Sequence, residues 1–183
     1  MVAGRRAPGR PGGAVTPTER TTSRLRLRRV VADDLAAFVA LETALRARET
    51  PPRDPPDPAE SARYLTAFTS VWDRGELGYW AIGFRDARSG DGVVGFGGVQ
   101  PKSWRGLRCW NLYYRVHPDL WGLGVATETA REAVAAAREA HPSWPVVVET
   151  RPGNAAAVAV AERVGLTPRE PDGGWAVLVL DPA

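Results

Sequence analysis

Two glycines spaced for a tight turn mark the segment of this sequence best suited to chemistry. The segment Trp121-Gly-Leu-Gly-Val-Ala126 joins a predicted strand to a predicted helix. Without Cβ atoms, Gly122 and Gly124 let the backbone turn sharply and aim successive N–H groups at one point before a helix N-terminus. The spacing suits an anion-binding loop or a purely structural turn. It matches neither the nucleoside-triphosphate loop nor the Gly-x-Gly-x-x-Gly dinucleotide pattern, so ATP and NAD are disfavoured.

The composition excludes several other kinds of site. The chain has 183 residues, enough for one domain with its own core. Its only cysteine is Cys109 and its only histidines are His117 and His141, so neither a disulfide framework nor a Cys/His zinc site can be assembled. We therefore expect no metal and a cytoplasmic protein. No stretch approaches the ~18 apolar residues of a membrane span, and we expect no membrane partner.

The positive charge is concentrated at the start of the chain. Residues 1–29 carry eight Arg and one Glu, whereas the whole chain has a net charge of +3, so the remainder is acidic. Residues 1–22 lack apolar periodicity, which predicts a disordered basic tail before one domain over residues 23–183. The tail has no interleaved aromatic residues, so a solvated tail is favoured over a nucleic-acid-binding arm. An acidic body suits a cationic amine substrate.

Hydrophobic periodicity predicts the elements that must position the glycine segment. Strands are expected at 23–30, 79–84, 93–99, 110–116, 145–150 and 175–180, with a hairpin turn at 89–92. Helices are expected after the N-cap candidates Asp33 and Asp34 and at 59–71, 126–140 and 154–164, with a proline-rich loop at 51–58. This order predicts an α+β or α/β fold whose mixed sheet is antiparallel early and has one late crossover.

At these residues the chain resembles the GNAT superfamily of N-acetyltransferases. Trp121 to Glu128 is similar to the acetyl-CoA pyrophosphate loop of the RimJ/RimL-like branch, which has Trp where other branches have Gln or Arg. Further matching blocks follow in the right order: 22–28 with 33–35, 79–82, 94–98, 114–118 and 154–166. The resemblance implies a mixed central sheet, splayed between two parallel strands and flanked by about four helices.

The resemblance also implies acetyl-CoA as the co-substrate. The Val116 amide would face the thioester carbonyl as an oxyanion donor. The pyrophosphate would lie on the loop and helix start, at Trp121, Gly122, Leu123, Gly124, Val125, Ala126 and Thr127. Asn154 would reach the pantetheine, although a residue of this type before a helix can also be an ordinary N-cap.

Three positions depart from the acid and base residues common in the family. Asn111 replaces a Glu, Ala157 replaces a Ser, and Ala161 stands where other branches have a general-acid Tyr. An amide or a methyl group cannot take up or release a proton in the chemical step. Catalysis would then depend on proximity, backbone electrostatics and proton transfer through water.

Other residues are candidates for these roles, each with a plainer alternative. Tyr113 shares a strand face with Asn111 and is a candidate acid, or a packing residue. His117 is a candidate base, or part of a turn beside Pro118. Glu149 is a candidate to receive the amine, or a solvated carboxylate at a strand end. Cys109 is more typical of core filling than of an acyl-carrying nucleophile.

The acceptor is the least defined part of the prediction. Trp104 and Trp110 flank a predicted loop at 103–108 that, with Asn111, is expected to line an acceptor site. We expect acetyl transfer to a primary amine, either a protein N-terminus or a small molecule, and a homodimer. The alternative is a catalytically silent acyl-CoA-binding sensor or interaction module, which the three replaced positions favour.

Overall fold

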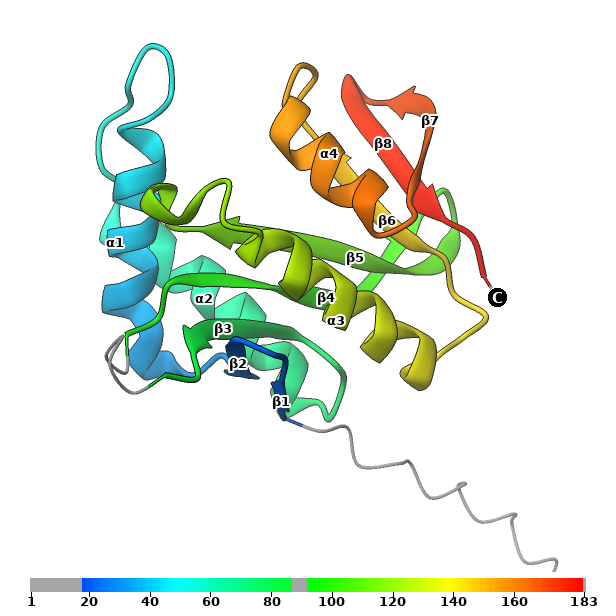
Figure 1. The fold of residues 1–183 in the computed structure, drawn as a ribbon, viewed down its shortest axis with the longest axis horizontal. Helices are drawn as coiled ribbons and strands as arrows, with labels where there is room; N and C mark the ends of the chain where they lie inside the picture. The colour runs from blue at the N-terminus through cyan, green and yellow to red at the C-terminus, as the bar shows by residue number, and fades with distance from the viewer. Residues whose placement is uncertain (1–17, 87–91, 183) are drawn as a thin grey trace, which may run out of the picture.

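The computed structural model describes residues 18–86 and 92–182, and its centre is a mixed sheet with helices on both faces (Figure 1). The strands are β1 Glu19–Thr21, β2 Leu25–Arg29, β3 Tyr79–Phe84, β4 Gly95–Trp104, β5 Leu107–Val116, β6 Val146–Thr150, β7 Thr167–Asp172 and β8 Trp175–Leu180. The α-helices are α1 Leu35–Arg46, α2 Pro58–Asp73, α3 Val125–Ala140 and α4 Ala155–Arg163. None of the helices in the described ranges is both long and apolar enough to cross a bilayer.

The sheet divides into two parts that meet at β5 and β6. Its strand order is β1-β2-β3-β4-β5-β6-β8-β7, and β5 and β6 are the parallel pair among antiparallel neighbours. They pair only at Trp110 with Val146 and at Asn111 with Val147, after which β5 continues to Val116 without β6 beside it. This confirms the predicted mixed sheet with one late crossover, made by α3 (Figure 1). We call the edge of β5 that β6 leaves unpaired, from Leu112 to Val116, the slot.

Alternation along the strands builds a separate core on each face. On β3, Trp80 and Ile82 pack with α3, whereas Tyr79 and Ala81 pack with Phe38 of α1 and other side chains of α1 and α2. Successive side chains of a strand point to opposite faces, so one strand serves both cores. The buried alanines of α3 let this helix lie close to β4 and β5: Ala130, Ala133, Ala136 and Ala137. Both cores therefore fix β5, the strand that leads into the glycine segment.

Four boundaries differ from the sequence prediction. Glu19–Thr21 pairs with β2, so the tail predicted for residues 1–22 is wrong at its end, and residues 1–17 lie outside the described residues. The predicted loop at 103–108 is instead a continuation of β4 and β5 around a tight turn at Arg105 and Gly106, with φ of 50° and 79°. β7 was not predicted because Thr167–Asp172 contains two prolines and is exposed. Asp34 precedes α1, but its carboxylate accepts from the Val31 N–H rather than capping the helix.

The antiparallel pairing of β3 with β4 confirms the predicted hairpin between them. Most of its predicted turn, at 89–92, lies outside the described residues.

Candidate functional site

The glycine segment forms a turn that leaves the first N–H groups of α3 without partners. Gly122 and Gly124 both have φ of 78°, a left-handed conformation that favours glycine. Gly124 is the N-cap of α3, no side chain caps the helix, and the first helical bond runs from the Glu128 N–H to the Gly124 carbonyl. The N–H groups of Val125, Ala126 and Thr127 therefore have no helical acceptor. The residues that precede them, Trp121 to Gly124, are all exposed, as access for an anion requires.

Trp121 holds this turn against the end of β5. Its indole Nε1 donates to the Val116 carbonyl at 3.0 Å, while the residue as a whole is 55% exposed. The stretch from Trp121 to Thr127 contains no Lys or Arg, so the positive potential of this turn comes from backbone N–H groups and the helix dipole. The sequence predicted Trp121 as a ligand-binding residue. The structure gives its indole N–H a different task, which is to join the loop to the strand.

The slot beside β5 is lined by backbone groups. The Trp110 N–H donates to the Pro145 carbonyl, toward β6, whereas the His117 N–H donates to the Val94 carbonyl, toward β4, both at 2.9 Å. N–H groups alternate between the two sides of a strand, so those of Leu112, Tyr114 and Val116 share the slot side with that of Trp110. β6 has already diverged at these positions. The Val116 N–H therefore points into the slot, as the sequence prediction requires.

α4 closes the slot on the α3 side of the sheet. The Tyr114 hydroxyl donates to the Ala157 carbonyl at 2.6 Å and so joins β5 to α4. Asn154 caps α4, because its Oδ1 accepts from the Ala157 N–H at 3.2 Å, and its Nδ2 donates to the Thr150 Oγ1 at 3.0 Å. The N-cap interpretation of Asn154 is thus confirmed. Its contact with a pantetheine arm stays a prediction.

An aromatic cluster fills the opposite face of β5. Tyr113 stacks on Tyr79 with ring centroids 4.9 Å apart, Phe68 packs edge-on against both rings, and the Asn111 amide donates to the Tyr79 hydroxyl. Burial raises the pKa of Tyr79 and of Tyr113 well above the ordinary value. A phenol that holds its proton this tightly is poorly matched to general acid catalysis near neutral pH. The packing alternative for Tyr113 therefore fits the structure better than the acid role.

Glu149 faces the same side of the sheet and is not free. Its carboxylate forms an ion pair with Lys102 of β4, which reaches across β5 near the point where β5 and β6 part. Lys102 is the only lysine of the sequence. A second charged pair, Arg115 with the buried Glu42 of α1, lies further along β5. Glu149 was predicted from the sequence, whereas its partner Lys102 and the nearby pair of Arg115 and Glu42 were not, although Lys102 stands out as the single lysine.

His117 and Cys109 lie in structural positions. The His117 Nδ1 accepts from the Asp119 N–H at 3.4 Å and caps the short 3-10 turn Pro118–Leu120. This geometry agrees with the turn interpretation of His117. Cys109 is fully buried beside Val147 and Val177, and burial raises the pKa of its thiol, which disfavours a nucleophilic thiolate.

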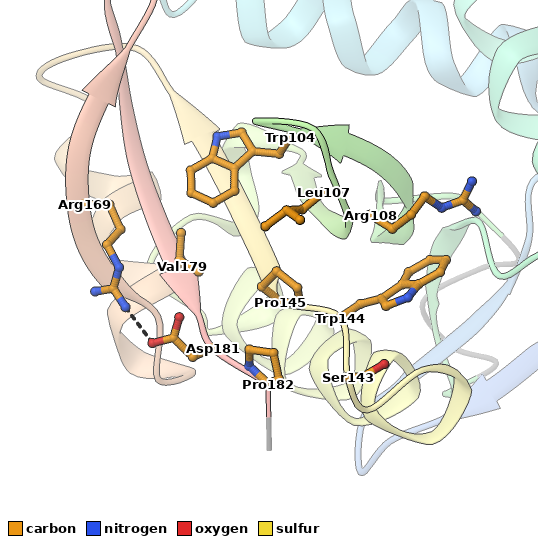
Figure 2. A pocket seen from close by; sticks show the side chains of 10 residues that line it. All are labelled: Trp104, Leu107, Arg108, Ser143, Trp144, Pro145, Arg169, Val179, Asp181 and Pro182. Carbon is orange, nitrogen blue, oxygen red and sulfur yellow. Dashed lines mark hydrogen bonds and ion pairs between the residues drawn. The ribbon is translucent and has the colours of Figure 1, made fainter.

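The tryptophans predicted to line an acceptor site do not meet at the slot. Trp110 is 2% exposed and packs against His141 and Trp144 in the core on the α3 side, so its predicted place at an acceptor site is wrong. Trp104 lines a cavity of about 440 Å³ with Leu107, Pro145 and Val179 (Figure 2). Leu107 precedes Val116 by nine residues of β5, roughly 30 Å at about 3.3 Å per residue. This cavity is therefore remote from Val116 and the glycine turn.

No group of three or more His, Cys, Asp or Glu side chains within residues 18–86 and 92–182 is arranged to hold a metal ion. The site is thus built from a turn at a helix start, the open edge of β5, and a few charged side chains on the far face.

Comparisons with known proteins place this geometry in a family. Residues 24–167 match the acetyltransferase (GNAT) domain. No curated protein matches the chain in sequence. Among solved structures, an acetyltransferase from Agrobacterium tumefaciens str. C58 has a TM-score of 0.74 at 22% identity, covering 94% of this chain and 99% of its own.

Two further solved structures carry names from the branch that the loop resembles. RimJ from Mycobacterium smegmatis, in complex with CoA-disulfide, has a TM-score of 0.64 at 20% identity, covering 85% of this chain and 81% of its own. RimL, a ribosomal L7/L12 alpha-N-protein acetyltransferase in complex with coenzyme A, has a TM-score of 0.65 at 15% identity, with 92% and 98% covered. At these identities the likeness concerns the fold. Since the domain match spans most of the chain, including β5, the glycine turn and α4, the protein belongs to the GNAT acetyltransferase family.

Proposed function

We propose that this protein transfers an acetyl group from acetyl-CoA to a primary amine by direct attack. The observation that supports this most strongly is the shared placement of two donor sets. The free N–H groups at the start of α3 and the slot-facing N–H of Val116 lie at the two ends of one short connection. The first set suits a diphosphate and the second suits the oxygen of a thioester carbonyl.

In this mechanism the backbone does most of the binding. The turn at Gly122 and Gly124 and the first residues of α3 hold the diphosphate, and the open edge of β5 bonds the amides of the pantetheine arm. The Val116 N–H donates to the carbonyl oxygen as the amine nitrogen bonds to the carbonyl carbon. The carbon–sulfur bond then breaks, the coenzyme leaves as a thiolate, and the amine proton passes to solvent or to a carboxylate.

Glu149 is the carboxylate best placed to receive the acceptor amine. It follows Val148 on β6, two residues beyond the last β5–β6 pair, and its side chain lies on the face of Asn111 rather than that of α3. Its ion pair with Lys102 shows that its surroundings accept an ammonium group. An incoming amine would replace or join the lysine there and lose its proton to Glu149 before attack.

We propose a protein N-terminus or a small amine as the acceptor and a homodimer as the assembly. The RimL structure is named for α-N-acetylation of a ribosomal protein, which supports a protein N-terminus. A silent acyl-CoA-binding module is the second candidate, supported by the lack of proton-transferring side chains at Asn111, Ala157 and Ala161.

One sample tests both candidates. Acetyl-CoA binding is measured by calorimetry, and thiol release is then followed with a panel of small amines and N-terminal peptides. We expect binding and turnover with at least one acceptor class. Binding without turnover across the panel would favour the silent module, and absence of binding would refute the proposed function. Light scattering of the same sample gives the assembly.

A further inference from the structure

The guanidinium of Arg24, the residue just before β2, contacts both ends of the turn into α3. Arg24 is 99 residues earlier in the chain than Leu123, yet its Nη1 donates to the Leu123 carbonyl at 3.0 Å. Its Nη2 lies 3.5 Å from the place where a Cβ on Gly124 would stand. The same side chain bonds the Glu128 carboxylate, through Nε at 2.8 Å and Nη2 at 2.7 Å. Arg24 thus connects the loop to the first turn of α3.

Glu128 accepts hydrogen bonds from several groups in the segment from Thr22 to Arg24. Besides the guanidinium, its carboxylate accepts hydrogen bonds from the Thr22 hydroxyl, the Ser23 hydroxyl at 3.1 Å and the Arg24 N–H at 3.1 Å. Burial alone would raise the pKa of Glu128, but these hydrogen bonds more than offset it and hold that pKa below its ordinary value. The carboxylate is therefore ionised at neutral pH, and the segment from Thr22 to Arg24 is tied to the start of α3.

The contact with Leu123 sets the direction of a peptide group. The Leu123 carbonyl and the Gly124 N–H belong to one planar trans peptide, in which C=O and N–H point in opposite directions. Holding the carbonyl toward Arg24, on the β2 side, turns the Gly124 N–H away from β2. A loop with glycines at 122 and 124 has wide backbone freedom, so such a contact selects one of several conformations.

The contact with Glu128 also bears on electrostatics. A carboxylate in the first turn of a helix is favourable for the helix itself, but it repels an anion bound at the same N-terminus. The Arg24 guanidinium, paired with Glu128 at 2.7 Å, offsets this negative charge. The loop from Trp121 to Thr127 carries no cationic side chain that would do so.

We propose that Arg24 is a positioning residue for acetyl-CoA: it orients the Leu123–Gly124 peptide toward the diphosphate and neutralises Glu128 behind it. The inference rests on the proposed use of this turn as the diphosphate site. Arg24 acts through the loop and needs no contact with the ligand.

The test compares full-length variants by two independent measurements. Calorimetry gives the Kd of coenzyme A, and hydrogen exchange of the ligand-free protein gives the protection of residues 121–131. We expect Arg24→Ala to weaken coenzyme A binding about tenfold and to speed exchange in this segment. Arg24→Lys should lie between, because an ammonium lacks the fork that reaches Leu123 and Glu128 together.

Arg26→Ala is the matched control. Arg26 lies two residues further along the chain and pairs with Glu19 of β1, at 2.7 Å, rather than with the loop. We expect its Kd for coenzyme A and its exchange at 121–131 to match those of the unsubstituted protein. The double variant Arg24→Ala/Glu128→Gln tests the charge effect, and it should bind coenzyme A about threefold more tightly than Arg24→Ala alone.

The outcomes separate this proposal from the function on which it rests. If Arg24→Ala changed neither Kd nor exchange, or changed Kd no more than Arg26→Ala did, the positioning role would be refuted. Faster exchange with an unchanged Kd would also refute it, because the loop would be held for a purpose other than binding. If the unsubstituted protein bound no coenzyme A, the proposed function would fall, while exchange would still show whether Arg24 holds the loop.

Discussion

The open edge of β5 and its face toward α1 and α2 differ in the groups that they offer. At the edge, which borders the slot, the groups suited to binding are backbone N–H groups of the strand, the glycine turn and the helix start. On the side of α1 and α2, the group suited to chemistry is a side chain, the Glu149 carboxylate, which is paired with Lys102. A backbone site needs only permissive residues, so its pattern is short and visible in sequence. A side-chain site changes with each substitution, so its partners emerge only from the fold.

The largest effect should come from a charge placed in the backbone site. We expect Gly124→Glu to weaken coenzyme A binding at least hundredfold, because a carboxylate would stand where the diphosphate lies. Calorimetry measures the affinity and circular dichroism checks the fold. Gly124→Ala is the matched control, since it shares the strain of a φ of 78° without the charge, and it should cost only a few-fold. Equal losses in the two variants would mean that backbone strain, not charge, was responsible.

The next largest effect should distinguish the side-chain site at Glu149 from the backbone site that binds coenzyme A. We expect Glu149→Gln to lower kcat/KM for the amine about tenfold to hundredfold while the Kd of coenzyme A stays the same, because the amide cannot accept a proton. Steady-state kinetics and calorimetry measure the two quantities. Glu170→Gln on the exposed strand β7 serves as a control. A parallel loss of coenzyme A affinity would show that the backbone site also depends on Glu149.

A moderate effect is expected where the backbone site depends on one side chain. Tyr114→Phe removes the hydroxyl that donates to the Ala157 carbonyl, which should lower the free energy of unfolding by about 1 kcal/mol. Urea denaturation measures this. Because the contact joins β5 to α4 across the slot, coenzyme A affinity should fall two- to threefold as well. An unchanged stability would mean that water replaces the lost donor.

The smallest effect is expected from the tyrosine once considered a general acid. Burial raises the pKa of Tyr113, so the folded state favours the neutral phenol. The unfolded chain loses this proton near the ordinary pKa of about 10, and the free energy of unfolding therefore falls as the pH rises above that value. We expect Tyr113→Phe to keep the pH–rate profile between pH 6 and 9 within twofold and to reduce the loss of stability above pH 10. If the substitution removed a pH-dependent change in rate between pH 6 and 9, Tyr113 would act as a general acid after all.

The sequence was most informative where a motif depends on backbone geometry. The glycine turn and the crossover through α3 were predicted, because glycine spacing and hydrophobic period report local conformation directly. The role of the Val116 amide came instead from the resemblance to the GNAT family. Contacts across long separations were not. Arg24 meets Glu128 across 104 residues, and nothing in either local pattern indicates the pair. Trp110 was predicted to lie at the acceptor site because the residues before it resembled a loop. In the structure these residues continue β5, and the Trp110 side chain is buried in the core.

The pair of Lys102 and Glu149 bears on whether the protein would acetylate itself. Of 24 cationic side chains, Lys102 alone has a primary amine, and the others are guanidinium groups, which do not react as amine acceptors at neutral pH. An enzyme that acetylates amines at high coenzyme concentration would find almost no targets on its own surface. The one internal target is held by a carboxylate, and its acetylation would release Glu149. Mass spectrometry after incubation with acetyl-CoA would record this slow self-modification as an added acetyl group at residue 102.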